Sequence, residues 1–211
     1  MRPVYGPKHL QETNEVNTFR NVSFVLFICL TTPVIGENHA ILFSGGYNLD
    51  DNHTRYRVET TLHYNLLISK FNYKPENITV IWADGDGVSP GTTGADCGGT
   101  NTNWQFALNN GSTVLSASEA NLQNAMQGLS YLDGDDMFYF WSYDHGGGYE
   151  GNTSKHDEET LTGWGVSIED QDFASWATSI NAGRQAYVMS QCYAGGMIEE
   201  FPDLIDWAQA K

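Results

Sequence analysis

The chain has 211 residues, of which 26 are acidic and 10 are basic, so its formal net charge is −16. Apolar residues make up 40 % of the chain, which is typical of a globular protein with one substantial core. So large a negative charge argues against nucleic acid as a partner, because nucleic-acid binding depends on Lys and Arg neutralising phosphates. It also argues against attachment to an anionic membrane surface. Three cysteines are too few for a disulfide scaffold.

A short apolar run at residues 22–30 follows Arg20 and leads into small residues and Pro33. This order is typical of a secretory signal, and the run is too short for a membrane-spanning helix, which needs roughly 20 apolar residues. The polar leader before it is long for a signal, so a buried strand is the alternative interpretation. We expect residues 1–37 to be a leader with a signal-like segment, and the protein to be secreted or extracytoplasmic.

Hydrophobic periodicity predicts strands that alternate with helices from residue 38 onward. Short apolar runs predict buried strands at residues 39–44, 78–82, 137–143 and 185–190. Apolar residues at helical spacing predict helices at residues 54–71, 116–131 and 167–180, and a short helix follows Gly195-Gly196. This alternation indicates an α/β fold, a three-layer sandwich with a mainly parallel sheet of at least four strands and helices on both faces.

The predicted elements fill one domain, residues 38–211. The chain ends in a predicted helix with no strand after it, which favours a domain truncated at its C-terminus over a sheet that ends at four strands. The Gly- and Asp-rich stretch 83–115 and the polar stretch 146–165 are expected to be irregular loops.

Local signals also predict how the first two helices begin and which side they bury. Val58, Leu62 and Leu66 recur every four residues, with Tyr64, Leu67 and Phe71 beside them, and predict the apolar stripe of the first helix, with Asn52 or Thr54 as its N-cap. Ser116 is expected to cap the second helix, with Glu119 as its capping-box partner and Leu122, Met126 and Leu129 on one face.

Two reactive residues come directly after predicted strands. The third strand runs into Asp144-His145-Gly146, and the fourth runs into Gln191-Cys192. Active groups of an open parallel sheet gather beyond the carboxyl ends of its strands, so neighbouring strands would bring His145 and Cys192 to one edge. A histidine beside a thiol can take its proton, and the thiolate is the attacking species. Glycines after each residue would let backbone N–H groups hold an oxyanion.

This pattern resembles the caspase-fold cysteine peptidases, which include caspases, legumains, gingipains and bacterial relatives. The resemblance rests on His145-Gly146 at one strand end and on Cys192 at another, 47 residues further along, close to the separation expected for caspases. It extends to the Ser44-Gly45-Gly46 strand end, the helix at 55–71 and the segment 75–84, and it covers residues 38–202. The match looks closest to the legumain-type and bacterial caspase-like branch.

The resemblance implies a cysteine-type endopeptidase that acts on a protein or peptide substrate without a cofactor. Cys192 would be the nucleophile and His145 the general base and acid. The backbone amides of Gly146 and Cys192 would form the oxyanion hole.

The resemblance also bears on the pocket for the side chain before the scissile bond. In legumain-type enzymes a basic residue near the start of the first helix helps to form this pocket, and loose alignment favours Arg57 over Arg55. A solvated helix face is the alternative for both arginines. Ser190 stands two residues before the nucleophile, where caspases carry Gln and legumains Glu, so the family's side-chain preference does not carry over.

Other functions stay open at the level of the sequence. One alternative is a catalytically silent caspase-like module that binds proteins or peptides. Another is a transamidase, which uses the same thioester but passes the acyl group to an amine. Calcium binding near Asp84 and Asp86, or at Asp133, Asp135 and Asp136, is an alternative to solvated turns there, although the first stretch lacks the full twelve-residue calcium-loop pattern.

Overall fold

The computed structural model describes residues 36–85, 104–148, 159–198 and 200, which all belong to one compact unit of the chain. The signal-like segment, Asp86, Cys97 and residues 201–211 lie outside this part. No helix among the described residues is long and apolar enough to cross a membrane.

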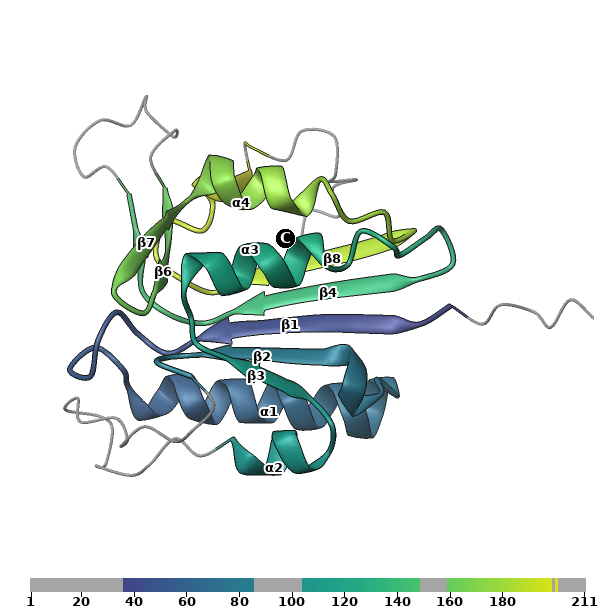
Figure 1. The fold of residues 1–211 in the computed structure, drawn as a ribbon. Helices are drawn as coiled ribbons and strands as arrows, with labels where there is room; N and C mark the ends of the chain where they lie inside the picture. Colours follow the sequence, from purple (N-terminus) through teal and green to yellow (C-terminus); the bar gives the residue numbers. More distant parts are fainter. Residues whose placement is uncertain (1–35, 86–103, 149–158, 199, 201–211) are drawn as a thin grey trace, which may run out of the picture. The chain divides into compact units, whose positions relative to one another are not determined.

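Five parallel strands form the central sheet, in the order β3-β2-β1-β4-β8 (Figure 1). They are β1 (Asn38–Ser44), β2 (Ile78–Trp82), β3 (Thr113–Leu115), β4 (Met137–Ser142) and β8 (Arg184–Met189). The four strands predicted from the sequence are all present, with ends within one residue of the prediction. The predicted α/β class with a mainly parallel sheet is therefore confirmed.

Helices cover both faces of this sheet (Figure 1). They are α1 (Thr54–Phe71) and α2 (Gln105–Asn109) on one face, and α3 (Glu119–Gln127) and α4 (Asp170–Ala177) on the other. Side chains of β1 alternate between the two layers, because successive residues of a strand point to opposite faces. Ala40 and Leu42 pack with α1, whereas Ile41 and Phe43 pack with α3 and α4.

The buried face of α1 differs from the predicted apolar stripe. Its buried residues are Tyr56, Thr60, Tyr64 and Leu67, whereas Val58, Leu62 and Leu66 are exposed. The prediction is confirmed for Tyr64 and Leu67 and wrong for the exposed residues, because the buried side also contains Tyr56 and the polar Thr60. The Thr60 hydroxyl donates to the Tyr56 carbonyl, and the Tyr64 hydroxyl bonds the Ser112 hydroxyl, so these polar groups are satisfied inside the core.

The helix caps also lie elsewhere than predicted. His53, rather than Asn52 or Thr54, is the N-cap of α1, and its side chain makes no capping hydrogen bond. Ser118, rather than Ser116, caps α3 by accepting a hydrogen bond from the backbone N–H of Asn121. The hydroxyl and carbonyl oxygens of Ser116 instead accept from the Asn121 side-chain amide, which holds Ser116 outside the helix.

A second sheet occupies stretches that the sequence predicted to be irregular or helical. Its antiparallel strands follow the order β5-β6-β7, with β5 at Gly146–Gly147, β6 at Thr160–Gly163 and β7 at Val166–Glu169. As a result, α4 begins at Asp170, after the strand residues that were predicted to open it. In the same way, α2 and β3 lie within the predicted loop 83–115. The remaining short turns of helix are η1 (Pro75–Asn77) and η2 (Gly196–Ile198).

Candidate active site

The structure brings the ends of β4 and β8 together. The two strands are parallel neighbours, and their last paired residues, Ser142 and Met189, are register partners. One residue further on, the Ser190 N–H donates to the Ser142 carbonyl at 2.9 Å. The segments that carry His145 and Cys192 therefore leave the sheet side by side, at the edge where the active groups of parallel sheets gather.

Close contact continues beyond the strand ends. A Cβ atom on Gly146 would lie only 2.1 Å from the Cys192 carbonyl oxygen, so the two backbones touch and only glycine fits. The Ser142 hydroxyl donates to the Gln191 side-chain oxygen at 2.7 Å, which fixes the residue before the cysteine. Cys192 therefore contacts Gly146, which directly follows His145 in the chain.

Cys192 lies on a sharp turn and is exposed to solvent. The next residue, Tyr193, has φ = 61°, a left-handed conformation that is rare for an aromatic residue. Backbone strain of this kind is concentrated at functional sites. The turn presents the thiol at the surface, where a nucleophile has to meet its substrate.

His145 is half-buried, and its Nε2 atom has no hydrogen-bond partner among the described residues. Burial lowers the pKa of His145 below its usual value, and the positive charges of His53 and Arg55 act in the same direction. The Asp51 carboxylate opposes them. The environment therefore favours a neutral imidazole, which is the form that can accept a proton.

Asp144, the residue before His145, links β1 to the site. Its two carboxylate oxygens accept hydrogen bonds from the Gly46 N–H at 2.7 Å and from the His145 N–H at 2.6 Å. Burial raises the pKa of Asp144 to about 7, although these backbone hydrogen bonds pull it down. The side chain thus connects the turn after β1 to the backbone that carries the imidazole.

Of the predicted oxyanion and pocket residues, Gly146, Ser190 and Arg55 lie at this edge. Gly146 belongs to β5 and pairs with Leu161 of β6, so a second sheet fixes its backbone. Ser190 is exposed beside β4. Arg55 is exposed and acts electrostatically on His145, while Arg57 is half-buried two residues further along the same helix. Since residues two apart point to different sides of a helix, the geometry favours Arg55 over Arg57 as the arginine next to the site.

The aspartates considered for calcium make hydrogen bonds within their turn. Asp133 and Asp136 accept from the backbone N–H groups of Asp135, Asp133 and Glu37. Within the described residues there is no group of three or more His, Cys, Asp or Glu side chains that could hold a metal ion. The arrangement of residues 133–136 is that of a self-capped turn.

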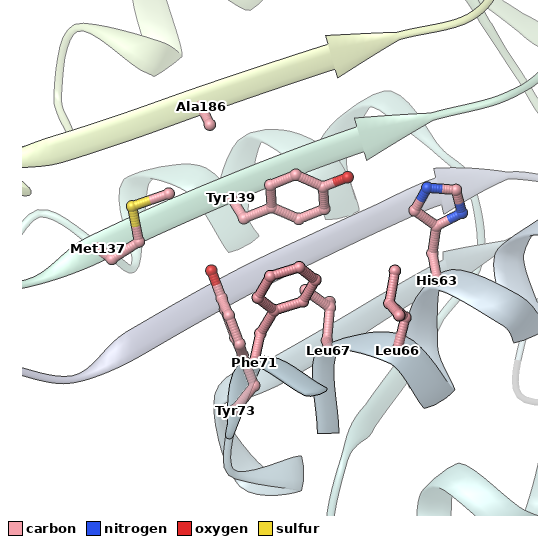
Figure 2. Close-up of a pocket in the computed structure, with 8 residues that line it drawn as sticks. All are labelled: His63, Leu66, Leu67, Phe71, Tyr73, Met137, Tyr139 and Ala186. Carbon is pink, nitrogen blue, oxygen red and sulfur yellow. The ribbon is translucent and has the colours of Figure 1, made fainter. Parts of the chain in front are cut away.

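A cavity of about 380 Å³ lies away from these residues, between α1 and strands β4 and β8 (Figure 2). Its lining is mostly hydrocarbon and aromatic: His63, Leu66, Leu67, Phe71, Tyr73, Met137, Tyr139 and Ala186. None of the predicted site residues lines it. The His63 ring stacks on Trp141 at a centroid distance of 4.2 Å, so this imidazole is part of the packing.

Sequence reasoning missed three residues near His145: Asp51, His53 and Tyr56. The rings of His53 and Tyr56 each lie 5.6 Å from the His145 ring, and the Asp51 carboxylate acts on its charge. The topology offered a signal, since the connection from β1 to α1 starts at the same sheet edge as the residues after β4. The first turn of α1 was therefore bound to lie beside the end of a neighbouring strand.

Comparison with known proteins adds no family assignment to this geometry. No family model matches the chain, and no curated protein matches it.

Proposed function

We propose that this protein is a cysteine-type endopeptidase of the caspase fold, with Cys192 as nucleophile and His145 as general base and acid. The observation that carries the proposal is the contact between two strand ends, in which Gly146 packs against the Cys192 carbonyl. The exposed thiol, the strained residue after it and the half-buried imidazole at the neighbouring strand end support the same assignment.

His145 takes up one proton and gives it back in each half of the reaction: from the thiol to the leaving amine, and then from water to the leaving thiolate. The imidazole takes the Cys192 proton, and the thiolate attacks the carbonyl carbon of the scissile peptide bond. The backbone N–H groups of Gly146 and Cys192 would stabilise the tetrahedral oxyanion. The imidazolium then gives its proton to the leaving amine, which produces a thioester. Water, deprotonated by His145, hydrolyses the thioester to a carboxylic acid and restores the thiol.

The substrate is a protein or peptide, and Arg55, Arg57 and Ser190 are candidates for contacts with the side chain before the scissile bond. An arginine at this place suits an acidic or amide side chain, because the guanidinium donates paired hydrogen bonds to oxygen atoms. Of the two arginines, Arg55 has the stronger case, since its charge acts on His145.

We further infer that the protein is exported, on the basis of the signal-like segment at residues 22–36. Expression of the full chain in a secreting host tests this. N-terminal sequencing of protein from the medium is expected to give a start after Pro33, whereas retention of the intact leader inside the cell would contradict export.

Labelling with a thiol-reactive peptide electrophile tests the enzymatic assignment. We expect the reduced full chain to form an adduct that peptide mapping places on Cys192, and to cleave a fluorogenic peptide library. Cys192→Ala should lose both, while Cys97→Ala, the matched control, should keep both. A folded chain without an adduct at Cys192 would contradict the peptidase and favour a silent binding module. Acyl transfer to an added amine in place of hydrolysis would indicate a transamidase.

A further inference from the structure

An aromatic cluster at the start of α1 surrounds the His145 imidazole. The rings of His53 and Tyr56 each lie 5.6 Å from the His145 ring, at interplanar angles of 61° and 85°. They also contact one another, with centroids 5.3 Å apart. The imidazole therefore meets two rings from one helical turn, both in edge-to-face geometry, which is the favoured arrangement of aromatic pairs.

The cluster is anchored on both sides. Tyr56 is buried, and its ring meets Tyr143 edge-to-face at 5.4 Å, two residues before His145. The Arg55 guanidinium lies 5.2 Å from the centre of the Tyr56 ring. Tyr56 thus contacts both the imidazole and the backbone segment that carries it, so its own ring has little freedom to move.

The buried Nε2 atom of His145 has no hydrogen-bond partner within the described residues. A catalytic imidazole has to keep one orientation, because a misplacement of about 1 Å can lower a rate 100-fold. No hydrogen bond from the described residues holds the Nε2 atom in place. The rings of His53 and Tyr56, in contrast, contact the imidazole.

We propose that His53 and Tyr56 are positioning residues, which hold the His145 imidazole in the orientation that its role as general base requires. This inference rests on the proposed function for its catalytic consequence. Its structural part, the contact of the two rings with the imidazole, is independent of any activity.

Paired substitutions in the full chain test the role of the Tyr56 ring. Tyr56→Phe keeps the ring, so kcat and the ring-current shifts of the His145 carbon-bound protons should stay near those of the natural protein. Tyr56→Leu removes the ring, and we expect kcat to fall about 10- to 100-fold with KM unchanged. The His145 proton signals should move towards values for a free imidazole.

A second pair at His53 decides the matter if Tyr56→Leu does not fold. His53→Ser places a preferred N-cap residue at the start of α1, where the backbone is extended, so the helix should persist. His53→Phe keeps a ring. Both variants lack the imidazole, and His53→Ser has the better N-cap. A lower kcat or shifted His145 signals in His53→Ser relative to His53→Phe would therefore report the missing ring and not a weaker helix start. We expect His53→Ser to be the slower variant.

The results separate this inference from the proposed function. If the natural protein cleaves peptides, and the Leu and Ser variants match their ring-keeping partners in kcat and in His145 signals, the positioning role is overturned while the peptidase stands. If the natural protein cleaves nothing, but the signals move only in the Leu and Ser variants, the ring contacts are upheld and the peptidase fails.

Discussion

The carboxyl edge of the central sheet and the cavity beside α1 are opposites in chemistry. The edge has an exposed thiol, an imidazole whose pKa is lowered and a buried carboxyl whose pKa is raised to about 7. The cavity has a volume of about 380 Å³, and apolar side chains dominate its lining. Burial raises the pKa of Tyr139 in this cavity to about 12, so the phenol stays neutral at physiological pH.

The described cavity and the reactive side chains therefore lie in different parts of the molecule. A cavity identifies where a ligand could fit, whereas catalysis needs a nucleophile beside a base and donors for developing charge. The segments after β4 and β8, which carry His145 and Cys192, leave the sheet side by side because parallel strands deliver their following residues to one edge.

The largest expected effect comes from replacing one histidine with alanine at the sheet edge and comparing it with the same replacement in the cavity. His145→Ala removes the proposed base and acid, and kcat for peptide cleavage should fall by about 10²- to 10⁴-fold. His63→Ala removes the imidazole that stacks on Trp141 in the cavity and should leave kcat near that of the natural protein. Steady-state kinetics of the two folded variants give the comparison. Equal losses in both, or a loss only in His63→Ala, would refute the assignment of the edge.

The second prediction concerns the pH dependence of stability at Asp144. Burial raises its pKa to about 7 in the folded chain, above the usual 3.8 of an aspartate, so between these pH values the folded state binds a proton that the unfolded state lacks. The free energy of unfolding should therefore fall as the pH rises through this window. A shift of about 3 units corresponds to about 4 kcal/mol. Below pH 4 and above pH 7 this contribution should be constant.

Asp144→Asn isolates this contribution, because the amide does not titrate. Urea unfolding of both proteins from pH 4 to pH 8 gives the difference in their free energies of unfolding. We expect this difference to change by about 4 kcal/mol across the window, to the disadvantage of the natural protein at high pH. Parallel pH curves would mean that Asp144 titrates at its usual pKa in the folded chain. Other groups, such as His145, affect both proteins and largely cancel.

Much of the fold followed from the sequence because the central strands have strong local signals. Continuous apolar runs such as 137–143 are typical of strands covered on both faces, and their alternation with helices indicates a parallel sheet. The short strands β3, β5, β6 and β7 have two to four residues each, which is too few for periodicity to reveal them. Tertiary pairing with neighbouring strands stabilises them.

The sequence predicted part of the candidate site. The placement of His145 and Cys192 after predicted strands anticipated their common edge, provided that the two strands were neighbours, as β4 and β8 are. The start of α1 was expected near the site through Arg55 and Arg57, but the ring contacts of His53 and Tyr56 with His145 were not anticipated. The predicted stripe left out Tyr56 and included the exposed Val58, so it did not show that Tyr56 faces the interior.

The smallest expected effect is a pair of opposite shifts in the pKa of His145. Arg55→Gln removes a positive charge that lowers this pKa, so the pKa should rise. Asp51→Asn removes a negative charge that raises it, so the pKa should fall. Lys70→Gln is the control, because Lys70 lies near the other end of α1, about 22 Å from Arg55 along the helix axis. Salt screens the interaction between charges that are more than about 10 Å apart. Titration of the His145 ring signals by NMR measures the pKa in all three variants directly and does not require turnover.

If the protein is a peptidase, the acid limb of kcat/KM should move with the pKa of His145, since only the neutral imidazole can take the thiol proton. Shifts of the same sign in Arg55→Gln and Asp51→Asn would show that these side chains act on the shape of the edge and not through their charge.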